Sequence, residues 1–236
     1  MDPLLISAAS GMKARIDTLD MLANNIANSG TTGFKSDREF YDLYDQHLPV
    51  IKTQWTDFSQ GSMIPTGNPL NLALSGKGMF ALNSPNGVVY SRTGDFRISK
   101  TNQIETPEGY TVRNLLDQGL PITVDPEQPI DISKDGTVSQ SGQALGQIEV
   151  DSPESTPQAL SKLGNSYFIS GAGVPVPKAL DSTEILQGQV EQSNVSVSES
   201  AVKLVGVMRQ FEMLQKAMNI SSDMSKRAIE EVAKVT

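Results

Sequence analysis

The sequence predicts an α+β protein in which N- and C-terminal helices form an α-helical coiled-coil domain, with a central all-β domain inserted between them. Apolar residues recur at spacings of three and four near both ends of the chain, which places side chains on one face of a helix. The middle carries short apolar runs punctuated by Gly, Pro and Asn, which is typical of strands joined by tight turns. We expect a discontinuous helical domain at 1–35 and 196–236, an extended connector at 36–71 and a β-domain at 72–195.

The first helix is expected to begin after Asp2–Pro3, where an acidic cap candidate precedes a proline of the first turn. It should end at residues 28–33, where turn-forming residues gather. Its length would be roughly 37 Å at 1.5 Å per residue. A stripe of apolar residues runs along it and needs a partner surface: Leu5, Ala9, Met12, Ile16, Leu19, Ala23 and Ile26.

The closing helix is expected from about Ser196 to Lys234, a length of roughly 55 Å. Gly206 is its weak interior residue, costing about 1 kcal/mol relative to Ala. Gln215, Ser222 and Ser225 interrupt the apolar stripe with polar positions. The apolar members of the stripe are Val197, Ala201, Leu204, Met208, Phe211, Met218, Ile229 and Val232.

Turn chemistry predicts the strands of the central domain. Ser84–Gly87 separates two apolar runs, 79–82 and 88–90, and indicates a hairpin. Thr106–Gly109 and Lys134–Gly136 are turns of the same kind. These turns imply an all-β module that extends through Tyr167–Ile169 towards Val190.

The connector is the least regular part of the chain. Residues 36–69 hold several aromatic side chains without a clean period, so we interpret the segment as partly extended and packed on the helices or on a neighbouring subunit. The proline-bearing segment 151–157 is expected to be a surface loop.

Composition excludes several classes of partner. The net charge of -8 and the pI of about 4.7 argue against nucleic acid, because phosphate binding needs clustered Lys and Arg. Cysteine is absent, which removes disulfides, thiolate nucleophiles and Cys-ligated metals. No apolar run is long enough to span a membrane. The amphipathic start without a basic leader argues against a cleavable signal peptide.

The search for chemistry predicts neither a catalytic residue nor a metal or cofactor site. His47 is the only histidine, and the G-x-S-x-G motif that would support a catalytic role is absent. A zinc site would need three or four suitable ligands at close spacing. Gly76–Gly78 lacks the rest of a phosphate-binding loop and is interpreted as a tight turn. Glu230–Glu231 and Asp135 are interpreted as solvated charges.

Three amides near the end of the first helix are a better signal. Asn24, Asn25 and Asn28 can terminate a helix, because Asn bonds free backbone groups and tolerates left-handed conformations. A second role remains equally open, in which a buried amide bonds across to another helix and fixes its register.

Several segments then resemble one known family. Ala23–Asn28 followed by Thr31–Lys35 is similar to the N-terminal signature of the flagellar basal-body rod and hook family. Asn68–Phe80 and Tyr90–Phe96 resemble the start of its central β-domain. Near the end, Gly188–Val195 and Arg209–Glu212 resemble its C-terminal signature, so the likeness covers most of the chain in the right order.

The resemblance implies an axial structural protein of the bacterial flagellum, with other rod proteins and copies of itself as partners. It implies export through the flagellar type III apparatus without a cleavable signal and polymerisation in the periplasm. In the polymer, the terminal helices would form the inner tube and the β-domain would face outward. The stripes and signatures together predict an assembly interface: Leu5, Met12, Ile16, Leu19, Asn24, Asn25, Ile26, Asn28, Gly33, Phe34, Ser193, Asn194, Val195, Leu204, Met208, Arg209, Phe211 and Met218.

Departures from the family pattern favour the proximal rod over the distal rod. Met208–Glu212, Leu214–Lys216 and the short connector before Pro65 differ from the distal-rod and hook pattern. Two readings from other classes remain open. They are a secreted coiled-coil fibre or adhesin, and a carbohydrate-active β-domain enzyme with helical extensions.

Overall fold

The computed structural model describes residues 3–41, 51–152, 160–171 and 183–235. The chain divides into two compact units. We call residues 1–27, 36–57 and 195–236 the helical unit, and residues 28–35 and 58–194 the β unit. The fold is α+β, with the helices at the two ends of the chain and most of the strands between them.

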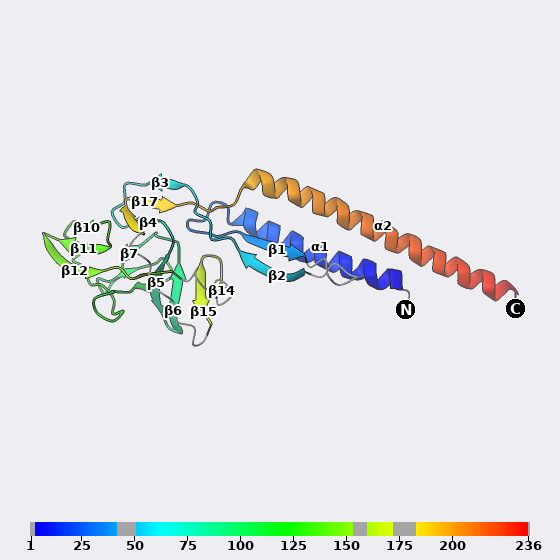
Figure 1. The fold of residues 1–236 in the computed structure, drawn as a ribbon, viewed down its shortest axis with the longest axis horizontal. Coiled ribbons are helices and arrows are strands. Elements are labelled where there is room, and N and C mark those ends of the chain that lie inside the picture. The colour runs from blue at the N-terminus through cyan, green and yellow to red at the C-terminus, as the bar shows by residue number, and fades with distance from the viewer. Residues whose placement is uncertain (1–2, 42–50, 153–159, 172–182, 236) are drawn as a thin grey trace. The chain divides into compact units, whose positions relative to one another are not determined.

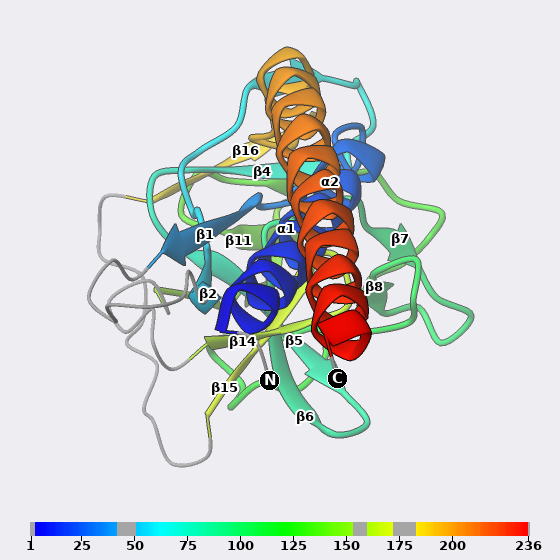
Figure 2. The ribbon, with the colours of Figure 1, turned by 90° about the vertical axis from the view of Figure 1, so that its right-hand side faces the viewer.

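The helical unit contains two helices and one hairpin. Helix α1 spans Pro3–Ala27 and helix α2 spans Val197–Val235, so the predicted helix bounds are confirmed to within one residue. Figures 1 and 2 show the helices side by side and antiparallel, with α2 reaching beyond the start of α1. Strands β1 (Asp37–Tyr41) and β2 (Ile51–Thr56) pair antiparallel, and β1 lies against α1.

The β unit is antiparallel throughout its described pairs. Its largest sheet has eight strands, in the order β14-β15-β6-β5-β9-β8-β7, with β13 also paired to β5. The strands of this sheet are β5 (Met79–Ser84), β6 (Gly87–Ser91), β7 (Arg97–Ile98), β8 (Ile104–Glu105), β9 (Thr111–Val112), β13 (Val150–Asp151), β14 (Leu160–Leu163) and β15 (Tyr167–Ser170).

Three smaller sheets complete the β unit. One has the order β10-β11-β12, and the other two pair β16 with β4 and β17 with β3. Their strands are β3 (Met63–Pro65), β4 (Leu72–Ser75), β10 (Ile130–Ile132), β11 (Thr137–Gln140), β12 (Gln143–Gln147), β16 (Glu184–Gln187) and β17 (Gln189–Glu191). The last two sheets join segments that lie more than a hundred residues apart in sequence.

The predicted turns are confirmed. The Ser84–Gly87 turn joins β5 to β6, Thr106–Gly109 joins β8 to β9, and Lys134–Gly136 joins β10 to β11. Gly76 and Gly78 have φ of 115° and 141° in the short turn between β4 and β5, as expected for a turn rather than a phosphate loop. Most of the predicted 151–157 loop lies outside the described residues.

The observed boundaries between the units differ from the expected ones. Residues 28–35 and 58–71, which were assigned to the helical domain and the connector, belong to the β unit. The described part of 36–57, which was expected to be extended, forms the β1–β2 hairpin. The reason is physical: residues 28–35 exchange backbone hydrogen bonds with Glu191 and Asn194, and β3 pairs with β17.

The core of the β unit is one apolar cluster. Phe80 and Phe96 meet edge to face in it, with ring centroids 5.2 Å apart, a favourable geometry for aromatic pairs. The sheet strands supply most of its fully buried side chains, including Leu72, Leu74, Leu82, Ile104, Val112 and Val138.

Candidate functional site

The face of α1 that is buried in the helical unit is not the predicted stripe. Ala14, Thr18 and Leu22 are each at most 5% exposed, and they follow one another at spacings of four. A methyl group placed on Gly11, on the same face, would lie 3.4 Å from Cδ1 of Leu214 in α2. Gly11 therefore lets α1 approach α2 closely at this point, and Thr18 on the same face donates a hydrogen bond to Glu39 of β1.

The predicted α1 stripe keeps exposed surface. Met12, Leu19 and Ile26 are half-buried, and Ile16 is 44% exposed. The side chain of Leu5 lies outside the described residues. Sequence periodicity found one apolar face of α1 and missed the other, because Gly11, Thr18 and Asn25 make the buried face look polar.

One row of apolar side chains along α2 is half-buried. Leu204, Phe211 and Met218, which the stripe included, are half-buried, and so are Val207 and Leu214. These five positions alternate spacings of three and four, the pattern of helix–helix packing. Met208 and Arg209 are exposed. Met208 therefore lies outside the half-buried row of α2, and its place in an assembly interface stays a prediction.

A second apolar row on α2 was missed by the sequence analysis. Val202, Met213, Ile220 and Met224 are 61–74% exposed. At 100° per residue they cluster on the side of the helix opposite to the half-buried row. Large apolar side chains grouped in this way on a surface indicate an interaction site.

Of the three amides near the end of α1, Asn25 makes two hydrogen bonds to the same backbone residue. Asn25, which is 4% exposed, donates from Nδ2 to the carbonyl of Asp37 at 2.8 Å and accepts at Oδ1 from the Asp37 N–H at 3.0 Å. The amide thus pairs with the backbone of β1, not with another helix. Asn28 is buried, its carbonyl accepts from the Thr31 N–H, and its Oδ1 accepts from the Thr31 hydroxyl at 3.3 Å, so it lies in the turn that follows α1. Asn24 is exposed.

The family-like turn after α1 is anchored inside the β unit. Gly33 has φ of 66° and donates its N–H to the Glu191 carbonyl at 2.8 Å. Its Cα hydrogens face the backbone of Thr93, where a Cβ would lie 2.3 Å from the Thr93 nitrogen, so only glycine fits. Phe34 has no exposed surface, and the Lys162 ammonium lies 4.3 Å from its ring centroid.

The C-terminal signature meets this turn. The Asn194 N–H donates to the Phe34 carbonyl at 3.4 Å, and Asn194 Nδ2 donates to Ser59 at 3.1 Å. Ser193 and Val195 are half-buried. The structure therefore brings Gly33, Phe34 and Asn194 together, although sequence spacing alone does not link them.

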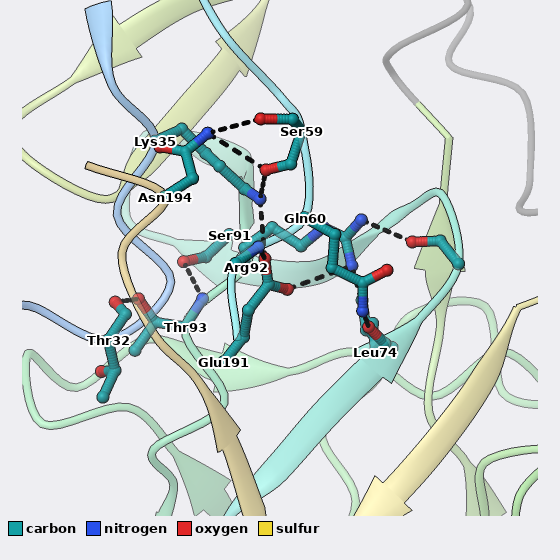
Figure 3. A network of polar contacts seen from close by, with 12 residues as sticks. Thr32, Lys35, Ser59, Gln60, Leu74, Ser91, Arg92, Thr93, Glu191 and Asn194 are labelled. Carbon is teal, nitrogen blue, oxygen red and sulfur yellow. Dashed lines mark hydrogen bonds and ion pairs between the residues drawn. The ribbon is translucent and has the colours of Figure 1, made fainter. Parts of the chain in front are cut away.

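Three buried charges lie at the same place (Figure 3). The Lys35 ammonium lies 2.7 Å from Glu191 Oε1, and Arg92 Nη1 lies 3.4 Å from Glu191 Oε2. The side chains of Lys35 and Glu191 are fully buried and that of Arg92 is 1% exposed. Sequence spacing does not pair Lys35 with Glu191, because they are 156 residues apart. All three residues nevertheless lie in the family-like segments Thr31–Lys35, Tyr90–Phe96 and Gly188–Val195.

The described residues offer little for catalysis. His47 lies outside them. In residues 3–41, 51–152, 160–171 and 183–235 no group of three or more His, Cys, Asp or Glu side chains could hold a metal ion. Asp135 is exposed, and hydrogen bonds from Ser133 and Thr137 lower its pKa, as expected for a turn residue.

Neither described helix combines the length and the apolar content that crossing a membrane would require.

Family models match three successive parts of the chain. Residues 5–35 match the model described as "Flagella basal body rod protein". Residues 73–140 match "Flagellar hook protein FlgE/F/G D1 domain", and residues 186–231 match "Flagellar basal body rod FlgEFG protein C-terminal". The first and last matches cover most of α1 and α2, and the middle match covers much of the β unit.

Curated relatives match along the whole chain. "Flagellar basal-body rod protein FlgF" of Caulobacter vibrioides is 31% identical over 248 residues, with 100% of both chains covered. "Flagellar basal-body rod protein FlgG" of Borreliella burgdorferi is 32% identical, with 93% of this chain and 95% of the relative covered. The FlgF protein of Mesorhizobium japonicum is 31% identical, with 95% and 94% covered. The chain therefore belongs to the flagellar basal-body rod protein family.

Proposed function

We propose that the protein is a structural subunit of the proximal part of the flagellar rod, that it polymerises through its terminal helices and that it has no catalytic role. Membership of the rod family makes it a rod structural protein. The proposal of polymerisation through the helices rests on the surfaces of α1 and α2. The proposal of the proximal rod rests on the departures from the family pattern noted above.

The observation that carries the proposal is the two-sided apolar character of α2. One row, with Leu204, Phe211 and Met218, is half-buried. The opposite row, with Ile220 and Met224, is exposed. Full burial of an aliphatic or Met side chain stabilises an assembly by about 1.5–3 kcal/mol, so neighbouring subunits that cover the exposed row would gain several kcal/mol each.

The helices are proposed to form coiled-coil contacts between subunits as well as within one. The half-buried row of α2 has the alternating spacing that such contacts require. Ser222 is a half-buried polar position on α2, and polar positions within an apolar seam fix the register of neighbouring helices. A shaft that transmits torque needs both adhesion and a fixed register.

The proposed setting follows the family resemblance. The subunit would leave the cytoplasm through the flagellar type III apparatus without a cleavable signal peptide and would assemble in the periplasm with other rod proteins. The terminal helices would lie near the rod axis and the β unit outside them. The net charge of -8 is suited to keeping an unassembled subunit soluble.

A distal-rod subunit is the alternative within the family. Relatives named FlgF and FlgG match at almost the same identity, 31% and 32%. The preference for the proximal rod therefore rests on Met208–Glu212, Leu214–Lys216 and the short connector. A cryo-EM map of basal bodies with a tagged subunit separates the alternatives: density at the base of the rod supports the proposal, and density only in the distal rod contradicts it.

The assembly surface is tested by single charges. Leu19→Asp on α1 or Phe211→Asp on α2 should abolish incorporation into basal bodies and motility, because an unpaired carboxylate in an apolar interface is costly. The melting transition of the β unit should stay near that of the parent protein. Asn219→Asp, at an exposed position of α2, is the matched control and should assemble.

Normal swimming of the Leu19→Asp or Phe211→Asp variant would contradict a role of these faces in assembly. A second test concerns catalysis: His47→Ala should leave motility intact. Loss of motility in that variant despite normal incorporation would favour an enzymatic role.

A further inference from the structure

The buried cluster of Lys35, Arg92 and Glu191 is more than a local ion pair. Glu191 Oε1 accepts hydrogen bonds from Lys35 Nζ at 2.7 Å and from the Gly61 N–H at 2.9 Å. Lys35 Nζ also donates to the Ser59 carbonyl at 2.7 Å. Figure 3 shows these groups converging from several segments of the β unit. Charges without exposed surface are costly unless they are paired and hydrogen-bonded. Glu191 Oε1 is both, whereas Glu191 Oε2 has the 3.4 Å ion contact with Arg92 Nη1 and no hydrogen bond from the described residues.

The cluster lies where the chain enters and leaves the β unit. The chain passes between the two units at residues 27/28, 35/36, 57/58 and 194/195. On the β-unit side, these passages continue into three segments, which are 28–35, 58–62 and 191–194. Lys35, Ser59, Gly61, Glu191 and Asn194 belong to these segments, and their polar groups bond to one another across them.

Backbone contacts close the same junction. The Gln192 N–H donates to the Ser62 carbonyl at 2.8 Å. A Cβ on Gly61 would lie 2.0 Å from the Gln192 carbonyl oxygen, so the two segments are in direct contact. Arg92, from the end of the β6 region, donates to the carbonyls of Leu74 and Gly76. Arg92 therefore ties the junction to β4 in the centre of the unit.

We propose that Lys35, Arg92 and Glu191 form an ionic clamp that holds the entry and exit segments of the β unit together under load. A force applied to the chain on either side of the unit would meet the Lys35–Glu191 bond and the Asn194–Phe34 bond before it reached the core. The mechanical role rests on the proposed function as a rod subunit. The clamp itself is a property of the isolated chain.

The shared carboxylate makes the clamp asymmetric. Glu191 contacts both cations, so Glu191→Gln takes an ion pair from each of them. Lys35→Met takes away one ion pair and leaves Glu191 with Arg92. If the clamp operates, Glu191→Gln is the more damaging change, and removing the Lys35 charge as well relieves part of the damage.

Thermal unfolding of the full chain tests this order. Glu191→Gln should lower the unfolding midpoint of the β unit by roughly 10 °C, because it removes the partner of buried charges. Lys35→Met should lower it less, and the double variant Lys35→Met/Glu191→Gln should unfold above Glu191→Gln alone. The proposal would be overturned by a double variant whose unfolding midpoint is no higher than that of Glu191→Gln, or that fails to fold as Glu191→Gln does.

The matched control is the exposed pair Lys134–Glu184 in the same unit. Its charges lie 3.1 Å apart, but their side chains are 73% and 52% exposed, and exposed pairs contribute little. Lys134→Met and Glu184→Gln should leave the midpoint within about 2 °C of the parent. An equal loss in this pair and in the clamp would show that burial and position are irrelevant.

Single-molecule pulling tests the mechanical role separately. The chain has no cysteine, so Ala27→Cys and Ser198→Cys provide unique handles on either side of all segments of the β unit. The Glu191→Gln variant should show a lower first rupture force than the handled parent, and Lys134→Met should not. Equal rupture forces in all three would overturn the clamp. Loss of rod incorporation in Phe211→Asp bears on the proposed function only.

Discussion

The two units bury their apolar side chains to different extents. In the β unit, Phe80, Leu82 and Ile104 have no exposed surface. In the helical unit, Val202, Ile220 and Met224 of α2 are 74%, 61% and 67% exposed. The β unit completes its own core within one chain. The most exposed of its described large apolar side chains, Leu116 and Leu120, lie in the short segment 115–120, whereas those of the helical unit extend along α2.

Polar contacts differ in the same sense. The β unit holds a fully buried ion pair between residues 156 positions apart. In the helical unit, by contrast, Arg38, which is 60% exposed, pairs with Asp57, and the exposed Lys203 pairs with Glu199 at the adjacent turn of α2. Exposed pairs of this kind are worth a few tenths of a kcal/mol. We therefore expect the β unit to be the stable part of an unassembled subunit.

Amide hydrogen exchange of a verified monomer should show the largest difference. Core amides of the β unit should exchange on the order of a thousandfold more slowly than those of α2, because they open only with the whole unit. Residues 28–35 should be protected with the β unit, since Gly33 donates its N–H to Glu191. Mass spectrometry of exchanged peptides measures both.

Slow exchange along the whole of α1 and α2 in the monomer would contradict the expected difference in stability between the two units. It would mean that the helix pair is stable without neighbours, and the exposed row of α2 would then lose its significance for assembly. Fast exchange in residues 28–35 would instead contradict their place in the β unit.

Adding one methyl group should have opposite effects in the two units. A Cβ on Gly94 would lie 1.6 Å from the Leu72 carbonyl oxygen, beside the hydrogen bond from the Leu72 N–H to the Gly94 carbonyl. Gly94→Ala should therefore cost more than about 4 kcal/mol or prevent folding of the β unit. Gly206 in α2 has open space around it, so Gly206→Ala should stabilise the helix by about 1 kcal/mol.

Chemical denaturation followed by circular dichroism measures both variants. A folded Gly94→Ala variant with near-parent stability would show that the Gly94–Leu72 contact can relax. Destabilisation by Gly206→Ala would mean that another group needs the space beside that glycine.

The link between α1 and β1 predicts a smaller effect. Asn25→Ala removes both hydrogen bonds to the Asp37 backbone and should destabilise the helical unit by about 1–3 kcal/mol. Asn24→Ala, at an exposed neighbouring position, should change stability by no more than about 0.5 kcal/mol. Thermal loss of helical circular dichroism compares the two. Equal effects would argue against a special role for the Asn25 amide.

Local chemistry explains which parts of the fold the sequence predicts. The turn at Ser84–Gly87 and the helix bounds near Pro3 and Asn28 depend on residues close together in the chain. The bounds of α1 and α2 and the β5–β6 hairpin were therefore predicted correctly. The mixture of helix and sheet follows from the same local signals.

Long-range pairing explains what the sequence does not predict. Pairing of β16 with β4 and of β17 with β3 joins segments more than a hundred residues apart, and no local pattern sets their register. The buried face of α1 was missed because Thr18 and Asn25 lie on it, and their hydrogen bonds satisfy polar groups that periodicity counts as exposed. The Lys35–Glu191 pair was missed because its residues lie far apart in sequence and because periodicity counts charged side chains as exposed.

A further expected effect is a dependence on alkaline pH that belongs to the β unit. Burial, with a further contribution from the nearby Asp151 carboxylate, raises the pKa of Tyr90 to about 12, and burial also raises the pKa of Tyr167. In the unfolded chain a tyrosine ionises near pH 10. Between about pH 10 and 12 the unfolded state thus loses a proton that folded Tyr90 keeps.

The stabilisation is therefore complete below about pH 10 and is lost as the pH rises towards 12, by about 2 kcal/mol for Tyr90. Tyr90→Phe should flatten this decline in the unfolding free energy of the β unit, because phenylalanine has no proton to lose. Denaturant titrations at pH 9, 10 and 11 measure the slope in both proteins. An identical slope in the variant would mean that the Tyr90 hydroxyl reaches water, and that the core of the β unit is more open than its burial indicates.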